Sequence, residues 1–520
     1  MRTVNHGTMG CGHCVLNRRQ FLAGCAACAA GAGSLTALSS RSYAAETTAK
    51  PRIRLVFTYR PSDRPIWPNI GYDFDKRKKT LLEQITKACP EIEFLPATVN
   101  TAEAAEKLVA ESGDVDGYFV WLLGLWTQAP QVIGATGKPT IFADDLYGGS
   151  GEFLIANAAA RRAGHKVVGV SSSRFEDVVA AVACFTLLKK PGATVDDFLA
   201  GATAAWKKGV QRSGDLTYKP DDVRTIDTAE CCKRLKASTI LVVGRNAKPL
   251  IEATENVVGT KVLPIEFSEL DAAYQSADRD EAAEWADRWI KTAAKVIEPS
   301  RDEIVKSAAM YLAEREVLKK HNAQAIAIHC LGGFYGGHIH AYPCLGFTQL
   351  NNDGLVGACE ADLMSTVTML AGSTLSGRPG YISDPVLDTS KNRIIYAHCV
   401  APTKVFGPDG DANPYHIRDH SEDRQGAAVR SLLPLGHMTT TLKLHPIRKE
   451  IILHQGKSVE NVDEDMACRT KLAVEVKGDI DKLMNEWDQW SWHRVTFFGD
   501  LKAPFEALAE ALGMKMVYEA

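Results

Sequence analysis

The 520-residue chain lacks the features that would assign it to a specialised class of protein. Its 63 acidic residues nearly balance 60 basic ones, and a net charge of −3 gives no electrostatic footprint for nucleic acid or anionic lipid. With 45% hydrophobic and 24% charged residues, the composition excludes disordered, collagen-like and disulfide-scaffold proteins. No GxGxxG motif follows the first strand-like segment of either α/β repeat, so a nucleotide cofactor has no support.

Acidic residues are absent from residues 1–45, which carry the twin arginine Arg18-Arg19 before a weakly apolar Ala/Gly stretch. Ser42-Tyr43-Ala44 follows as a small-residue cleavage site. The pattern predicts a Tat signal, which exports a folded protein to the periplasm or medium and leaves no membrane anchor after cleavage. A stop-transfer anchor is the alternative, but the stretch is rich in small residues and hardly reaches membrane-spanning length.

Closely spaced cysteine pairs are absent from the segments beyond the signal, apart from the adjacent Cys231 and Cys232. Cys11-Gly12-His13-Cys14 resembles a metal or redox motif but lies in the segment due for removal. The remaining scattered cysteines indicate neither a zinc site nor a regular disulfide framework, and we expect most of them to be buried thiols.

Short apolar strands alternate with amphipathic helices from residue 51 onward, which predicts α/β architecture with parallel sheets. The alternation restarts at residues 166–171 and changes beyond Gly377 to a mostly antiparallel β pattern. We therefore expect a signal at 1–45, two Rossmann-like parallel α/β domains at 46–165 and 166–375, and a β-rich domain at 376–520.

Two carboxylates stand where α/β proteins place ligands. Glu360 lies at the entrance of an apolar-periodic helix, and Asp384 closes the short strand-like segment 380–383. Helix N-termini favour anions, and strand ends open on crevices. The alternative is purely structural, because an Asp before Pro often makes a turn and a Glu in a first helical turn favours the helix dipole.

Histidines and tryptophans offer further candidates. His338 and His340 follow a glycine-rich run, where they form either a chelating pair on a strand face or part of a flexible substrate loop. His398 ends a strand, and His493 directly precedes one. A lone histidine is more often a packed, hydrogen-bonded residue. Trp492 could stack on a sugar, although core packing is the commoner role of such residues.

The last third of the chain resembles L-fucose isomerase. The segments that carry the resemblance are Glu360-Ala361-Asp362-Leu363, Leu375-Ser376-Gly377-Arg378-Pro379 and Ile382-Ser383-Asp384, followed by the closing His493-Arg494-Val495-Thr496-Phe497-Phe498-Gly499-Asp500. Pro434-Leu435-Gly436-His437 and Gln455-Gly456 are similar to the β domain of the wider L-fucose/L-arabinose isomerase superfamily. Over 51–330 the resemblance is limited to a matching α/β order.

The resemblance implies a fucose isomerase-like fold with a barrel-like C-terminal unit. It also implies that Glu360, Asp384 and His493 bind a metal, and that Glu360 and Asp384 transfer the proton. His338, His340, His398 and Trp492 remain candidate substrate contacts. The family has Asn where Trp492 precedes the histidine, which leaves the sugar open. The family's trimers and hexamers imply a homo-oligomer.

Two carboxylates and one imidazole suit Mn²⁺ better than zinc, which prefers sulfur- and nitrogen-rich tetrahedral sites. Such an ion acidifies the C–H beside a sugar carbonyl, and a carboxylate moves the proton. We therefore expect an exported metal-dependent sugar isomerase. The alternatives are a related epimerase or lyase acting on an oxidised sugar, and a non-catalytic periplasmic carbohydrate-binding protein.

Overall fold

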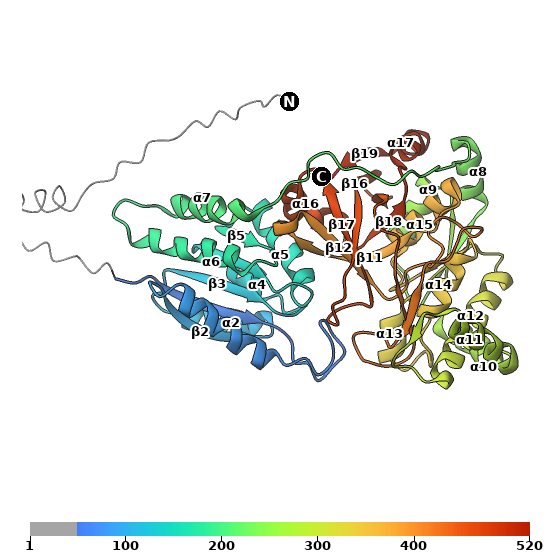
Figure 1. The fold of residues 1–520 in the computed structure, drawn as a ribbon, viewed down its shortest axis with the longest axis horizontal. Coiled ribbons are helices and arrows are strands. Elements are labelled where there is room, and N and C mark those ends of the chain that lie inside the picture. The colour runs from blue at the N-terminus through green and yellow to red at the C-terminus, as the bar shows by residue number, and fades with distance from the viewer. Residues whose placement is uncertain (1–48) are drawn as a thin grey trace, which may run out of the picture. The chain divides into compact units, whose positions relative to one another are not determined.

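The computed structural model describes residues 49–520, of which Lys50–Ala520 form one compact unit. The predicted export signal at 1–45, with Cys11 and Cys14, lies outside the described residues. Three large sheets and one small sheet organise this unit, and Figure 1 shows how its strands and helices are arranged. No helix among these residues combines the length and apolarity needed to cross a bilayer.

The first sheet is parallel, with strand order β2-β1-β3-β4-β5. Its strands are β1 (Arg52–Thr58), β2 (Glu93–Val99), β3 (Gly117–Leu122), β4 (Thr140–Asp144) and β5 (Val167–Val170). The helices of this part of the chain are α2 (Phe74–Ala88), α3 (Ala102–Glu111), α4 (Ala129–Gly134), α5 (Ser150–Arg162), α6 (Phe175–Ala183), η1 (Cys184–Lys189), α7 (Val195–Trp206) and η2 (Lys207–Gly209). Strands β3, β4 and β5 are buried along their whole length, as expected for a parallel sheet covered on both faces.

The second sheet is also parallel, with strand order β10-β9-β6-β7. Its strands are β6 (Thr239–Val243), β7 (Lys261–Ile265), β9 (Ala325–Ile328) and β10 (Val356–Ala358). The helices here are α8 (Thr228–Ala237), α9 (Lys248–Val257), α10 (Phe267–Ser276), α11 (Arg279–Thr292), α12 (Arg301–Lys320), α13 (Cys330–Tyr335), α14 (Cys344–Asn352) and α15 (Leu363–Ser376).

Six antiparallel strands close into a barrel in the order β15-β18-β11-β12-β17-β16, because β16 pairs back with β15. They are β11 (Tyr381–Asp388), β12 (Arg393–His398), β15 (Met438–His445), β16 (Glu450–Asn461), β17 (Thr470–Lys477) and β18 (Arg494–Phe498). Strand β19 (Lys515–Tyr518) adds to β16 in parallel. The expected α/β class with a barrel-like C-terminal unit is confirmed.

Short elements complete the β-rich part. Strands β8 (Lys295–Val296), β13 (Tyr415–Arg418) and β14 (Ala428–Ser431) form a small sheet. The helices are η3 (Thr389–Lys391), α16 (Ile480–Glu486), η4 (Trp487–Trp490) and α17 (Lys502–Ala511).

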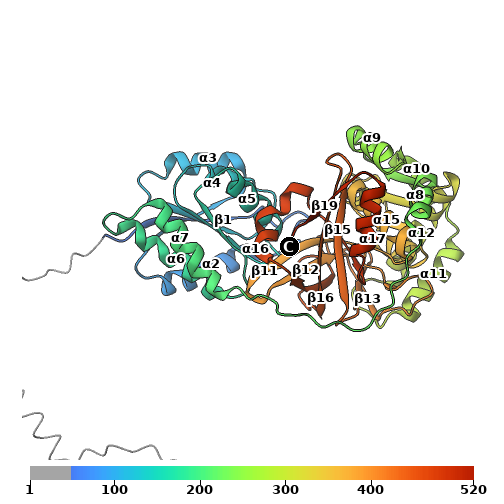
Figure 2. The same ribbon diagram turned by 90° about the horizontal axis from the view of Figure 1, so that it is seen from above.

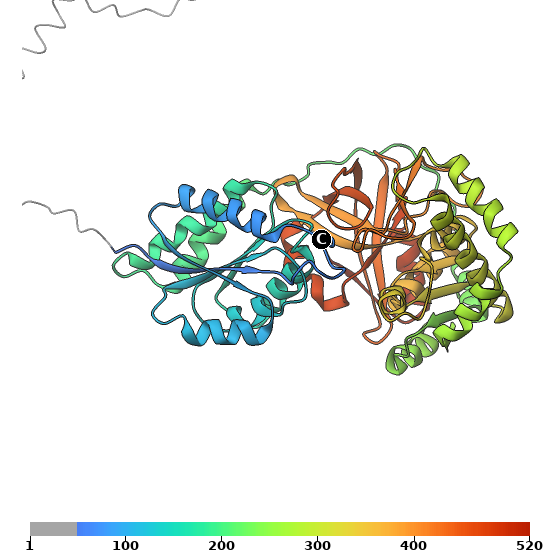
Figure 3. The same ribbon diagram turned by 90° about the horizontal axis from the view of Figure 1, so that it is seen from below.

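The barrel strands alternate between two apolar cores. On β12, Ile394 and Tyr396 pack in the cluster that contains the first sheet, whereas Ile395 and Ala397 pack in the cluster that contains the second. A period of two along the strand places successive side chains on opposite faces. The barrel therefore lies between the two parallel sheets, as Figures 2 and 3 show from above and below.

Two expectations about strands differ from the structure. Strand β5, expected to restart the α/β pattern at 166–171, pairs with β4 and so belongs to the first sheet. Asp384, expected at a strand end, lies inside β11, which continues through Pro385 to Asp388. Proline fits there because β11 pairs with β18 only over residues 381–383, which leaves one side of Pro385 without a partner strand. The division into domains stays a prediction.

Candidate active site

A strained turn carries Glu360. Strand β10 ends at Ala358 and α15 begins at Leu363. Between them Glu360 and Ala361 have φ values of 60° and 48°, a left-handed conformation that costs a non-glycine residue on the order of 1 kcal/mol. The turn is held by the Ala361 N–H, which donates to the Ile328 carbonyl oxygen over 2.9 Å. This turn places the Glu360 carboxylate between the second sheet and the barrel.

Asp384 and His493 come from neighbouring barrel strands. Strand β11 pairs with β18 through Ser383 and Arg494, so the residues that follow and precede this pair lie close together. His493 Nε2 is 3.1 Å from Asp384 Oδ1 and 3.7 Å from Glu360 Oε2. Donor atoms that share one ion at about 2.1 Å stand roughly 3 to 4 Å apart. The structure thus brings together the three residues predicted as metal ligands.

A buried charge network orients His493. Asp362 Oδ2 accepts from His493 Nδ1 over 3.0 Å and from Lys443 Nζ over 3.0 Å. Lys443 has no exposed side-chain surface. Because the Asp362 carboxylate accepts a hydrogen bond from Nδ1–H, Nε2 is the nitrogen that faces Glu360 and Asp384.

Sequence reasoning missed both Asp362 and Lys443 as site residues. Two signals for them were present. Asp362 stands two residues after Glu360 and caps helix α15 through the backbone N–H of Ser365. Lys443 is the one charged residue in the apolar and threonine-rich run Thr439–Leu444.

Trp492 fixes Asp384. Its Nε1–H donates to Asp384 Oδ1 over 2.5 Å, and its carbonyl oxygen accepts from Trp487 Nε1 over 2.8 Å. The preceding Ser491 has φ 70° and ψ −174°, a region that is essentially restricted to glycine. Strained backbone therefore flanks the cluster on two sides, at Glu360 and at Ser491.

His398 lies beside the cluster with a different orientation. Its Nδ1 accepts from the Cys399 backbone N–H over 2.9 Å, so in the neutral ring Nε2 carries the proton. Nε2 is buried, has no hydrogen-bond partner among residues 49–520, and stands 3.9 Å from Glu360 Oε1. Burial lowers the pKa of His398, which favours this neutral form. The ring is therefore set to donate a hydrogen bond rather than to bind an ion through Nε2.

The electrostatics separate the two carboxylates. Burial raises the pKa of Glu360 to about 8, and the negative charge of Asp384 contributes to this rise. A third of the Glu360 side chain remains exposed. Burial also acts on Asp384, but the positive charge of His493 outweighs it and lowers the pKa. For His493 burial is outweighed by Asp384 and its neighbours, which raise the pKa to about 10.

A cavity of about 320 Å³ opens onto these groups. Its walls contain Glu360, His493 and Trp492, with Arg245 as the only arginine or lysine among the described residues that line it. Trp126, which is 45% exposed, forms a second aromatic wall. The space suits a small polar molecule with an apolar face.

Other candidates lie elsewhere. His338 is exposed and stacks on Phe267, and His340 is exposed near Asp271, with neither lining the cavity. The structure therefore does not bring His338 and His340 to the cluster. The tryptophans Trp121, Trp487 and Trp490 are buried core residues and do not line the cavity.

The donor set fits a divalent cation. Asp384 and His493 offer ligand atoms within 4.8 Å of each other, as do Cys359 and Glu360, and the His398 ring lies within the same distance of both pairs. His493 Nε2 is buried and makes no well-formed hydrogen bond with the described residues, so an ion would bind there by displacing the proton of the charged ring. Carboxylate oxygens with imidazole suit Mn²⁺ and similar ions.

Comparisons with known proteins point to sugar isomerases. The chain is 26% identical over 256 residues to the sulfoquinovose isomerase of Clostridium sp. (strain MSTE9), a match that covers 47% of this chain and 54% of the relative. It is 29% identical over 257 residues to the sulfoquinovose isomerase of Priestia aryabhattai, with 48% and 56% covered. It is 29% identical over 192 residues to that of Alkalicoccus urumqiensis, with 34% and 41% covered. No family model matches the chain. The chain spans about half the length of the curated relatives it matches, and these relatives are sugar isomerases.

Proposed function

We propose that the protein is a metal-dependent isomerase that interconverts an aldose and a ketose through an ene-diol. The observation that carries the proposal is that carboxylate oxygens of Glu360 and Asp384 lie 3.7 Å and 3.1 Å from His493 Nε2 beside a cavity. The relatives, named as sulfoquinovose isomerases, support the same reaction class.

Glu360, Asp384 and His493 would hold the ion, with Mn²⁺ as the best match to their donor atoms. When bound, a divalent ion supplies Lewis-acid chemistry that makes the C–H beside the sugar carbonyl more acidic. Asp384 is held by Trp492 and His493 and exposes only 8% of its side chain, so it stays a fixed anion.

Proton transfer falls to Glu360. Its carboxylate exposes a third of its side chain, against 8% for Asp384, and so it can reach substrate carbon. Glu360 takes the proton from C2 of the aldose and returns it to C1, while the hydroxyl proton of O2 passes to O1, which yields the ketose. His398 Nε2–H donates a hydrogen bond to a substrate oxygen as charge develops there.

The cavity favours an anionic sugar. Arg245 lines it, and its Nη1 lies 3.5 Å from the Glu360 carbonyl oxygen, close to where the sugar's reacting end would sit. A guanidinium pairs well with the planar or tetrahedral oxygens of an acidic substituent. Sulfoquinovose, the sugar in the relatives' names, carries a sulfonate and is therefore the first substrate to test.

The decisive experiment follows the carbon-bound hydrogen. The purified chain is supplied with Mn²⁺ and incubated in D₂O with sulfoquinovose or with neutral aldoses, and NMR detects a ketose with deuterium at C1. We expect Glu360→Gln to lower turnover by about 10² to 10⁴-fold. The matched variant Glu83→Gln, at an exposed position on α2, should keep full turnover.

Other outcomes distinguish the alternatives. Inversion at one carbon, or loss of water from an oxidised sugar, would replace the isomerase with an epimerase or a lyase that uses the same residues. Sugar binding in calorimetry without any turnover, unchanged by EDTA, would leave a carbohydrate-binding protein.

The proposal includes export and assembly. The twin arginine at Arg18-Arg19 supports export as a folded protein, and the resemblance to L-fucose isomerase supports a homo-oligomer. Fractionation of producing cells tests the location, and light scattering of the purified chain tests the number of subunits.

A further inference from the structure

Two thiols touch behind the candidate site. Cys330 Sγ lies 3.1 Å from Cys359 Sγ, and the two residues are 1% and 4% exposed. Cys330 opens helix α13 soon after β9, and Cys359 directly follows β10. Because β9 and β10 are parallel neighbours, their carboxyl ends deliver both sulfur atoms to the same place.

This sulfur pair is coupled to the site through the chain. Cys359 is bonded directly to Glu360, in the turn where Glu360 and Ala361 adopt left-handed conformations. The next residue, Ala361, is anchored by its N–H to the Ile328 carbonyl oxygen. If Cys359 is displaced while Ala361 stays anchored, the backbone of Glu360 between them has to move.

We propose that Cys330 and Cys359 form a modification site, at which a hydroperoxide makes a reversible disulfide that displaces Glu360. The sulfur atoms of a disulfide are about 2.05 Å apart, so closure shortens the present separation by about 1 Å. Among the nine described free cysteines, Cys330 and Cys359 stand 3.1 Å apart at their sulfur atoms, and Cys399 and Cys468 form a second pair of interacting thiols.

The chemistry balances with one equivalent of hydrogen peroxide. One thiolate attacks the peroxide O–O bond, gains a hydroxyl group as sulfenic acid and releases hydroxide, which takes up the thiol proton as water. The second thiol then displaces the hydroxyl from sulfur, the S–S bond forms and a second water leaves. Two electrons pass from the sulfur pair to the peroxide, and a dithiol reductant returns them.

Peptide mapping without reduction tests the disulfide directly. The full purified chain is treated with hydrogen peroxide, alkylated and digested with chymotrypsin, since cleavage after Tyr335 and Phe347 separates Cys330, Cys344 and Cys359. We expect a linked Cys330–Cys359 peptide pair with a mass about 2 Da below the sum of the two thiol peptides, which a dithiol reductant abolishes. Recovery of both cysteines as alkylated thiols, or of either linked to Cys344, would overturn the site.

A matched pair of variants controls for general oxidation. Cys359→Ser should abolish the linked peptide, while Cys89→Ser, at an equally buried cysteine in the core of the first sheet, should leave it unchanged. If Cys359→Ser does not fold, the wild-type map still decides the question. Persistence of the same linked mass in Cys359→Ser would contradict the assignment.

The effect on turnover rests on the proposed function and is measured separately. Oxidised protein should lose about 10- to 100-fold in isomerase turnover, the size of effect that a 1 Å misplacement of a catalytic group produces, and the reductant should restore it. A disulfide without loss of turnover would overturn the displacement of Glu360. Absence of turnover in the reduced protein would overturn the proposed function and leave the disulfide standing.

Discussion

At the scale of single residues, the site depends on side chains that position the candidate metal ligands. Asp362 accepts from His493 and Lys443 at once and is only slightly exposed. Lys443 lowers the pKa of Asp362 well below its usual range, against the effect of burial. The carboxylate is therefore a permanent anion that holds the His493 ring by its Nδ1 proton.

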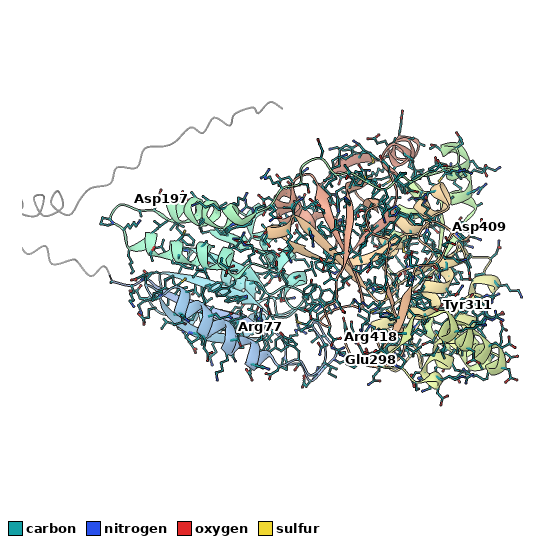
Figure 4. All side chains as sticks on the ribbon, viewed as in Figure 1. Arg77, Asp197, Glu298, Tyr311, Asp409 and Arg418 are labelled. Atoms are coloured by element: carbon teal, nitrogen blue, oxygen red, sulfur yellow. The ribbon has the colours of Figure 1, made fainter. Side chains whose placement is uncertain are left out.

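Asp362→Asn should weaken metal binding and turnover by about 10- to 100-fold, because an amide holds the Nδ1 proton less strongly and leaves Lys443 without a counter-charge. Titration of the purified protein with Mn²⁺ measures the affinity, and turnover is followed in parallel. The control is Asp409→Asn, in an exposed loop at the edge of the molecule (Figure 4), which should change neither. Equal Mn²⁺ affinity in Asp362→Asn and wild type would show that His493 needs no anchor.

The sequence indicated the residues of the cluster but not those that position them. Each of the three predicted metal ligands, Glu360, Asp384 and His493, lies in a short contiguous segment that resembles a known family. Asp362 and Lys443 are 81 residues apart, and their contact exists only because α15 packs against β15. A helix cap and a strand lysine each have ordinary local explanations, so pairing them requires the fold. His338 and His340 show the converse, since a suggestive local motif lies away from the cluster.

At the scale of secondary-structure elements, helix α12 buries a carboxylate without a partner. Glu314 has no exposed surface, and neither of its side-chain oxygens has a hydrogen-bond partner among the described residues. It lies one turn from Tyr311, which Figure 4 labels, and faces helix α14. A Cβ at Gly346 would come within 2.2 Å of Glu314 Oε2, so the two helices pack too closely for a side chain there.

Glu314→Gln should stabilise the protein at neutral pH and above. Burial raises the pKa of Glu314 well above the ordinary 4.5. The protonated form therefore makes its whole contribution to the free energy of unfolding below pH 4.5, and this contribution is lost as the pH rises through the raised pKa. Glutamine is neutral throughout, and the gain at pH 8 should be about 1 to 3 kcal/mol, with almost none at pH 4.5. Thermal unfolding at both pH values measures it. A Tm difference that is the same at pH 4.5 and pH 8 would contradict the explanation.

Element types were easier to predict than element pairing. The alternation of apolar strands and amphipathic helices predicts parallel α/β structure, and both parallel sheets are present. It does not say which sheet an edge strand joins, so β5 was expected in the second unit although it completes the first. Closure of the barrel depends on β15 meeting β16 and β18, and the contact with β18 spans more than 50 residues of chain. Such long-range contacts have no local signature.

At the scale of the whole molecule, one buried ion network ties the barrel strands together. Glu519, which follows β19, accepts from His454 Nδ1 over 2.7 Å and pairs with Arg494 Nη2 over 3.1 Å. All three side chains are at most 1% exposed. Arg494 also lies over the Trp487 ring, 4.1 Å from its centroid, which links the barrel to helix η4. The buried pair of Glu519 and Arg494 contributes stability only while both keep their charge and their partners.

Acid should therefore unfold the protein partly through Glu519. Burial would raise the pKa of Glu519, but Arg494 outweighs it and lowers the pKa from 4.5 to about 2. A depressed carboxyl pKa gives stability that is fully present above pH 4.5 and is lost as pH falls toward 2, here about 3 kcal/mol in total. Glu519→Gln should cost about 3 to 5 kcal/mol at pH 7, because it leaves Arg494 buried without a counter-charge. It should also flatten the fall in Tm between pH 4.5 and pH 2.

Circular dichroism melts across this pH range measure both effects. The control is Glu510→Gln at an exposed position on α17, which should follow the wild-type curve. If Glu519→Gln lost stability at pH 7 but kept the wild-type slope in acid, the network would act through packing rather than charge. Acid sensitivity of the whole molecule would then have to arise at other carboxylates. Asp465 is the next to replace, because Arg424 and Arg469 lower its pKa below the ordinary range.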